Sequence, residues 1–276
     1  MGRIKDFAIQ RPFVFAVLLI LSALVVEILA GSLAFMLFRV EQTDSAFAPS
    51  VLLITTLYLV FILWSFNWLK ASGVATLGSW KGWAAALILL AYYLFALMYA
   101  FFGEFNFIVP TDALSGLKIP TLFINVVFEE VLFRGLILYA LVSVWGATRK
   151  GVLKAVIMTA ILFGLVHAVN AVMGDPGEVP GQIAVALFEG VWWAAVVLRW
   201  GSVWPVVFIH GVTNWVLQTK ALSYVDYRGS ASSYTLAVLL GLPLVALGVW
   251  WISRTALRYQ GRDLSHLTSE RPGHKK

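Results

Sequence analysis

Eight long apolar stretches follow one another along this chain, and they restrict its fold more than any other feature of the sequence. They cover residues 12–38, 49–69, 83–102, 120–146, 152–172, 182–198, 203–219 and 234–252. A helix of about 17 to 25 apolar residues is long enough to cross the hydrocarbon core of a bilayer. Because 61% of the 276 residues are hydrophobic and only 12% are charged, a water-soluble fold of this size is excluded. We therefore predict an all-α integral membrane protein, a bundle of about eight transmembrane helices.

The chain is expected to form one polytopic membrane domain over residues 1–276. The first apolar stretch is longer than the core of a signal peptide, and it continues past the small residues Ala30, Gly31 and Ser32, so we interpret it as an anchor that is not cleaved. Polar groups within the apolar stretches gather in a core at residues 120–219. Residues 254–276 form a polar, basic tail, to whose His266 and His274 we assign no chemistry.

Lysine and arginine predict the orientation, because cytoplasmic connections carry an excess of these residues. With eight helices and a cytoplasmic N-terminus, Arg39, Lys118, Lys220 and Arg228 lie outside and Arg134 lies within the membrane, which leaves 15 of the 20 basic residues inside. Both termini, including the tail, are then cytoplasmic, and we expect a bacterial plasma membrane. The net charge of +6 follows from this orientation and does not indicate nucleic-acid binding.

The stretch at residues 120–146 places Glu129, Glu130 and Arg134 inside an otherwise apolar segment. A charged side chain near the centre of a membrane helix costs roughly 2.5 to 3.5 kcal/mol on insertion scales. Three such side chains therefore require ion-pair or hydrogen-bond partners, or a function that justifies the cost. Glu130 and Arg134 are four residues apart on one helix face and are expected to pair. Since Glu129 lies about 100° around the helix, it is the carboxylate left for function.

Two further spans carry intramembrane polar groups at the same spacing. Phe163 and His167 lie four residues apart on one span, and His210 and Asn214 lie four residues apart on another. A single histidine in a span is usually a packing or hydrogen-bonding residue. Together with Glu129, however, two imidazoles and an amide provide what is needed to activate a water molecule and to stabilise an oxyanion.

In these motifs the sequence resembles the CAAX-protease and bacteriocin-processing (CPBP, or Abi) intramembrane endopeptidases, which include prenyl-protein endopeptidases. The paired-glutamate motif EExxxR corresponds to Glu129, Glu130 and Arg134, and the remaining FxxxH and HxxxN motifs follow in the family's order and on separate spans. The GSVWP run at residues 201–205 resembles a short turn of the family, so the resemblance covers about residues 120–219. It implies hydrolysis of a peptide bond within the membrane.

The resemblance also implies roles for individual residues. Glu129 would act as general base for water, His167 would help to hold that water, and His210 and Asn214 would face the oxyanion. Glu130, Arg134 and Phe163 would support them. The alternative within the same class is a metalloprotease in which zinc is held by His167, His210 and Glu129, since this ligand set occurs in catalytic zinc sites. We favour a glutamic mechanism without a cofactor, because the chain has no HExxH motif and asparagine is a poor zinc ligand.

One carboxylate departs from the family pattern, and other functions compete with proteolysis. Glu189 lies in the span at residues 182–198, where a role in the site and a hydrogen-bonded packing role are equally supported. The competing functions are a non-enzymatic membrane scaffold of the same fold and a proton-coupled carrier. A scaffold would not need to keep all four of Glu129, His167, His210 and Asn214, and a carrier should show broken helices.

The predicted substrate is a membrane-anchored or lipidated peptide that enters from the lipid bilayer. Helix rise of 1.5 Å per residue places Glu129 and His210 roughly 14 Å, and His167 and Asn214 roughly 8 Å, from the outer ends of their spans. The sequence therefore predicts a site in the outer half of the membrane that opens to the non-cytoplasmic face. The acidic outer connections, which include Glu178, would rim it.

Overall fold

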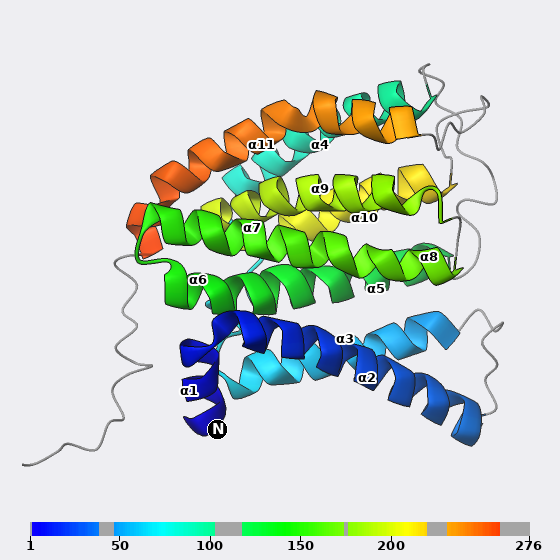
Figure 1. The fold of residues 1–276 in the computed structure, drawn as a ribbon, viewed down its shortest axis with the longest axis vertical. Coiled ribbons are helices and arrows are strands. Elements are labelled where there is room, and N and C mark those ends of the chain that lie inside the picture. Colours follow the sequence, from blue (N-terminus) through cyan, green and yellow to red (C-terminus); the bar gives the residue numbers. More distant parts are fainter. Residues whose placement is uncertain (1, 39–46, 103–117, 174–175, 220–230, 260–276) are drawn as a thin grey trace, which may run out of the picture.

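The computed structural model describes residues 2–38, 47–102, 118–173, 176–219 and 231–259, and within these ranges every regular element is a helix (Figure 1). The predicted basic tail and both of its histidines lie outside the described residues, apart from the segment up to residue 259. In chain order the elements are α1 (Gly2–Gln10), α2 (Pro12–Phe38), α3 (Phe47–Ser65), α4 (Trp80–Phe102), α5 (Lys118–Glu130), the π-helix η2 (Val131–Leu138), α6 (Tyr139–Trp145), α7 (Arg149–Val166), the 3₁₀ turn η3 (His167–Val169), α8 (Asn170–Met173), α9 (Val179–Trp200), α10 (Trp204–Thr219) and α11 (Ala231–Tyr259).

The prediction of an all-α membrane bundle is confirmed, but the predicted count of eight spans is not supported. Six helices in the described part of the chain, α2, α3, α4, α7, α9 and α11, are long and apolar enough to cross a membrane. The other two predicted spans are helical but differ from a simple span. Helix α10 has 16 residues in the described part of the chain, and the path through α5, η2 and α6 changes helix type twice and carries Glu129, Glu130 and Arg134 in its middle. The change from α-helix to π-helix falls directly after Glu130.

Helix α9 lies at the centre of the bundle, where it packs against α4, α7, α10 and α11 (Figure 1). It is the most buried of the six candidate spans. Small residues permit this close packing. A Cβ atom added to Gly190 would lie 2.8 Å from Cα of Ala160 in α7, and one added to Gly248 of α11 would lie 3.1 Å from Cβ of Ala195. Side chains on α9 therefore reach neighbouring helices on several sides.

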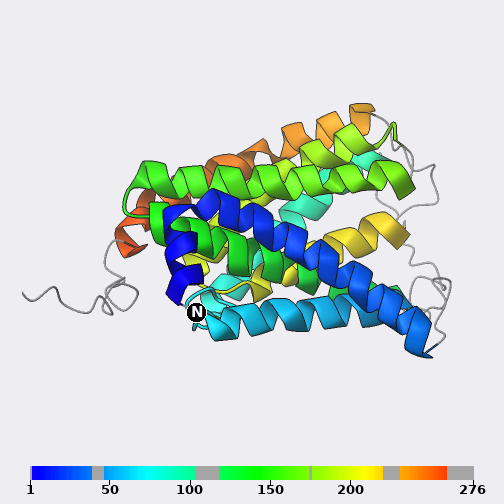
Figure 2. The ribbon, with the colours of Figure 1, turned by 60° about the horizontal axis from the view of Figure 1, so that its bottom comes forward.

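Helices α2 and α3 pack against each other on one face of the bundle, the face that comes forward in Figure 2. The outer face of α2 presents large apolar side chains such as Ile28 and Met36, which are 69% and 70% exposed. Such a surface is suited to lipid. The short helix α1 was not predicted as a separate element, and it packs at one end of α2 and α6. That end also contains the turn from α6 to α7 and the last turns of α11 (Figure 1).

A hydrogen-bonded junction fixes the start of α10, the helix that carries two of the predicted site residues. The hydroxyl of Thr76, in the connection from α3 to α4, donates to the carbonyl of Gly201 at 2.9 Å, and the hydroxyl of Ser202 donates to the Thr76 carbonyl at 2.6 Å. The indole N–H of Trp204 donates to the Val74 carbonyl at 2.9 Å. Gly201 has a φ of +70°, which favours glycine, and it ends α9. The GSVWP turn is therefore held by residues distant in the sequence.

Candidate active site

The predicted ion pair between Glu130 and Arg134 is present in the interior of the bundle. Arg134 Nη1 lies 3.0 Å from Glu130 Oε1, and both side chains are 0% exposed. Glu129 is 19% exposed, so the two adjacent carboxylates have different surroundings. A buried charge is tolerated only when it is paired, which assigns Glu130 to the ion pair and leaves Glu129 accessible.

The helix changes type at the point where these charges occur. Helix α5 ends at Glu130, and the following eight residues, Val131–Leu138, form π-helical turns before α6 begins. Wider turns of this kind are rare and are found frequently at functional sites. Gly135 lies within the wide turns, and a Cβ atom there would lie 2.8 Å from Cγ2 of Val74. The connection from α3 to α4 thus approaches the helix directly beside Arg134.

His210 joins α10 to the ion pair. Its Nδ1 lies 2.8 Å from Glu130 Oε1, and its Nε2 lies 2.9 Å from Asn214 Nδ2. A carboxylate only accepts hydrogen bonds and an amide nitrogen only donates, so these contacts assign the proton of the neutral ring to Nδ1 and a lone pair to Nε2. The order of contacts is therefore Arg134, Glu130, His210 and Asn214. This chain of contacts fixes the orientation of the imidazole.

Glu129 faces the opposite side of the same imidazole. Its Oε1 accepts a hydrogen bond from Asn125 Nδ2 at 2.8 Å, and its Oε2 lies 3.6 Å from His210 Nε2. Oε2 is buried and has no hydrogen-bond partner among the described residues. A buried acceptor of this kind calls for a water molecule or a substrate group. The arrangement thus leaves one carboxylate oxygen available next to His210.

His167 approaches the cluster through an aromatic ring. Its Nδ1 lies 2.8 Å from the carbonyl oxygen of Phe163, one turn earlier, and the two rings pack edge to face at 5.0 Å. Because a carbonyl only accepts, Nδ1 carries the proton and Nε2 has the lone pair. The Phe163 ring also lies 6.2 Å from the ring of His210. Phe163 therefore contacts both imidazoles.

Two aromatic side chains flank the arginine and one of the histidines. Arg134 Cζ lies 4.2 Å from the ring centroid of Phe163 and 5.2 Å from that of Trp193 in α9. The Trp193 ring lies 4.4 Å from the His210 ring at an interplanar angle of 34°. Aromatic faces attract cations, so these rings stabilise the guanidinium where water is excluded.

Glu189 also belongs to this region. It lies in α9 four residues before Trp193, is buried, and accepts a hydrogen bond from the hydroxyl of Tyr93 in α4. Residues four apart share a helix face, so the carboxylate lies on the same side of α9 as the indole that packs on His210.

The alternative metal site is not assembled in the described part of the chain. No group of three or more His, Cys, Asp or Glu side chains there is arranged to hold a metal ion. The lone pair on His210 Nε2 accepts a hydrogen bond from Asn214, and its Nδ1 is occupied by Glu130. A zinc ion on His210 would bind at Nε2 and replace the contact with Asn214, whereas the Nδ1 contact with Glu130 is one that zinc-bound histidines commonly keep.

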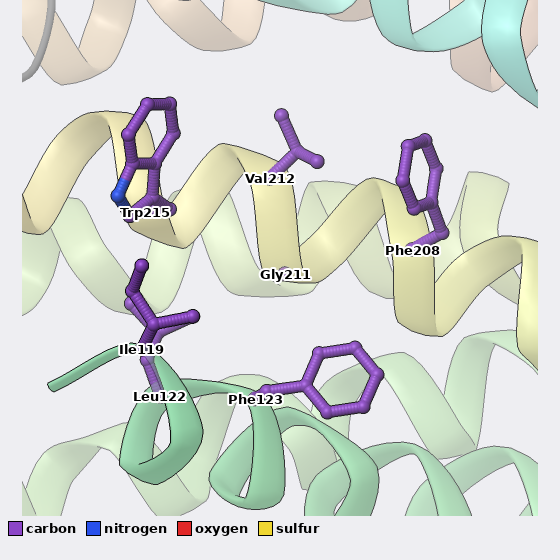
Figure 3. Close-up of a pocket in the computed structure, with 7 residues that line it drawn as sticks. All are labelled: Ile119, Leu122, Phe123, Phe208, Gly211, Val212 and Trp215. Carbon is purple, nitrogen blue, oxygen red and sulfur yellow. The ribbon is translucent and has the colours of Figure 1, made fainter. Parts of the chain in front are cut away.

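An apolar groove lies between α5 and α10, the helices that carry Glu129 and His210 (Figure 3). It has a volume of about 280 Å³. Its lining residues are Ile119, Leu122 and Phe123 from α5 and Phe208, Gly211, Val212 and Trp215 from α10. Gly211, which follows His210 directly, lies between the aromatic side chains. The described lining of the groove is apolar, and none of the polar residues of the cluster belongs to it.

The fold and this cluster define a class of protein, a polytopic membrane protein with buried carboxylate, imidazole and amide groups on three separate helical segments. Residues 111–216 match the family described as Type II CAAX prenyl endopeptidase Rce1-like. This match confirms the resemblance predicted from the three motifs, all of which lie in the matched segment, and assigns that segment to the CAAX-protease family. Neither a curated protein nor a solved structure gives a significant match to the chain.

Three residues of the cluster were not predicted from the sequence. Asn125 is four residues before Glu129, a spacing at which an amide and a carboxylate can meet on a helix, so the sequence contained a signal for it. Trp193 is four residues after Glu189, but an aromatic residue in a span is usually a packing residue. Tyr93 lies far from the motifs in the sequence, and only the packing of α4 on α9 brings it into the cluster.

Proposed function

We propose that this chain is an intramembrane endopeptidase in which Glu129 activates a water molecule to hydrolyse a peptide bond. The single observation that carries the proposal is the free Oε2 of Glu129, 3.6 Å from His210 Nε2, in a segment that matches a family of endopeptidases. A general base needs a hydrogen-bond acceptor directed at the reacting water, and Oε2 is such an acceptor. Glu130 also has an oxygen without a partner, but its side chain is 0% exposed, against 19% for Glu129, and its Oε1 contacts both Arg134 and His210, so it is less suited to this role.

In the proposed reaction, Glu129 takes one proton from water while the oxygen of water attacks the carbonyl carbon of the scissile peptide. The carbonyl oxygen becomes an oxyanion in a tetrahedral intermediate. The Glu129 carboxylic acid then gives its proton to the peptide nitrogen, and the bond between carbon and nitrogen breaks. His167, whose Nε2 has a lone pair, would accept a hydrogen bond from the same water.

Asn214 and His210 are proposed to stabilise the oxyanion. The amide of Asn214 has two N–H groups; one donates to His210 Nε2, so the second is available to the oxyanion. His210 becomes a second donor only when Nε2 has taken up a proton from water, because Nδ1–H is directed at Glu130; Nε2 then no longer accepts from Asn214, whose two N–H groups both become available. An imidazolium at this place would be held between the carboxylates of Glu129 and Glu130. Preorganised donors of this kind contribute strongly to catalysis in a water-poor site.

The groove between α5 and α10 supports a substrate with an apolar part. The groove lies between the two helices that carry Glu129 and His210, and in this proposal its apolar lining receives the apolar portion of the substrate. A membrane-anchored or lipidated peptide matches this chemistry. A prenylated CAAX peptide is the first probe, because the matched family is described as prenyl endopeptidases.

The test compares wild-type protein with Glu129→Gln in lipid nanodiscs, using a fluorescence-quenched peptide that ends in a prenylated CAAX sequence. A parallel comparison of membrane peptides from cells that express either form detects other substrates. We expect cleavage by the wild type and a loss of at least roughly 10²-fold in kcat for the variant. Equal turnover by both forms would refute the assignment of Glu129. Absence of any product from the wild type in both assays would favour a non-enzymatic scaffold or a carrier.

A further inference from the structure

Asn125 is the one polar side chain between Thr121 and Glu129, in a stretch of α5 that is otherwise apolar. Burying a primary amide costs free energy unless it is hydrogen-bonded, and asparagine is also a poorer helix former than leucine or alanine. An apolar residue would therefore serve packing better at this position. The mechanism above assigns no role to Asn125, so its presence one turn before the proposed base calls for an explanation.

Asn125 makes a direct contact with that base. Its Nδ2 donates a hydrogen bond to Oε1 of Glu129 at 2.8 Å, and the spacing of four residues places both side chains on one face of the helix. Within the described part of the chain, this is the one hydrogen bond that the Glu129 side chain makes, because His210 Nε2 is 3.6 Å from Oε2, too far for a hydrogen bond. Asn125 therefore occupies one carboxylate oxygen and leaves the other free.

The charged groups around Glu129 do not fix its orientation. The elements packed on α5 are α3, which has no charged residue, η2 with Arg134, and α10 with His210. Arg134 is paired with Glu130, and His210 Nδ1 is also directed at Glu130. Glu130 itself and the half-buried Glu27 of α2 are acids, which donate nothing to a carboxylate when they are ionised. The direct donor that remains among the described residues is the amide one turn earlier.

We propose that Asn125 is a positioning residue for the general base, which holds Oε1 of Glu129 so that Oε2 is directed at the reacting water beside His210. A carboxylate with one oxygen bound in this way cannot rotate freely, and catalysis depends on such fixed geometry. The inference rests on the proposed function for its catalytic meaning, but the hydrogen bond to Glu129 exists without turnover. Asn125 does not touch the reacting atoms in this scheme.

The first measurement needs no substrate. Infrared difference spectra in nanodiscs, in which each protein is compared with its own Glu129→Gln counterpart, isolate the carboxyl stretching bands of Glu129, which respond to a hydrogen bond on one oxygen. We expect these bands to shift in Asn125→Leu and to return towards their wild-type positions in Asn125→Gln, which retains an amide. The matched control is Asn170→Leu, because Asn170 donates to Gln182 at 3.0 Å and its loss should leave the bands unchanged.

The second measurement is hydrolysis of the prenylated peptide by the same variants. We expect kcat to fall roughly 10- to 100-fold in Asn125→Leu with little change in KM, because a misdirected base lowers the rate without removing a substrate contact. Asn125→Gln should recover part of the rate. In a double-mutant cycle, Asn125→Leu should have no further effect on the residual rate of Glu129→Gln, since its effect passes through that side chain.

Bands of Glu129 that are identical in wild type and Asn125→Leu would overturn the proposal and leave Asn125 as a packing residue. A full additional loss of rate in the Glu129→Gln background would also overturn it, because Asn125 would then act independently of the base. If Asn125→Leu does not fold, Asn125→Ala decides, since it removes only the amide. If the wild type cleaves no peptide, the proposed function fails, while the infrared bands still decide whether Asn125 holds Glu129.

Discussion

Replacement of Arg134 by methionine should destabilise the protein strongly, and the structure allows the magnitude to be worked out. The Arg134–Glu130 pair is completely buried at 3.0 Å, so the variant leaves Glu130 as a buried charge with no cation. Breaking a buried pair from one side costs about 3 to 5 kcal/mol. At about 1.4 kcal/mol per factor of ten, the ratio of folded to unfolded protein should fall by roughly 10² or more. Methionine retains an unbranched apolar chain between Phe163 and Trp193.

The measurement is thermal or denaturant unfolding in nanodiscs, followed by the fluorescence of the 12 tryptophans. The informative control is the double variant Glu130→Gln with Arg134→Met, in which neither charge remains. We expect it to recover most of the stability that either single variant loses, because no unpaired buried charge is left. It should nevertheless have low activity, since a carboxylate no longer orients His210. The reasoning is wrong if Arg134→Met unfolds like wild type, or if the double variant is as unstable as the single one.

Three further predictions follow from the site and the orientation. His167→Ala should abolish hydrolysis without a large change in unfolding, because only the ring contact with Phe163 and the hydrogen bond to its carbonyl are lost; retained turnover would remove His167 from the mechanism. Chelators should leave activity largely intact, and metal that copurifies stoichiometrically with activity would reverse this prediction. In intact cells an impermeant maleimide should label a cysteine at Pro176 and not one at Lys150, since the chain has no native cysteine; the opposite pattern would invert the orientation.

A final prediction concerns the groove in Figure 3. A Cβ atom added to Gly211 would lie 3.7 Å from the Phe123 ring, an ordinary contact, so Gly211→Leu is accommodated by its own helix but projects into the groove. For a prenylated peptide we expect a rise in KM of roughly tenfold, while kcat changes little, because the variant removes apolar binding and no reacting group. The matched control is Gly211→Ala, which should have a smaller effect. An unchanged KM in the leucine variant would show that substrate does not use this groove.

Much of the architecture and part of the site were predictable from the sequence. The length of an apolar stretch predicts a membrane-spanning helix without any tertiary information. The bilayer sets both the length that a span needs and the requirement that its backbone hydrogen bonds are internal. The pairing of Glu130 with Arg134 follows from helical spacing alone. That Glu129 stays outside this pair was predictable for the same reason, since one arginine at the fourth position can face only one of two adjacent carboxylates.

The count of spans and the connections of the site were decided by tertiary structure. Spacing cannot show that the helix takes wider turns after Glu130, because this depends on what packs against it. Similarly, the contacts of His210 with Glu130 and Trp193, and of Glu189 with Tyr93, join helices separated by many residues. A sequence determines which groups share one helix face, because that geometry is local. Which faces meet is settled only when several helices pack together. In this bundle α4, α7 and α10 all pack against α9.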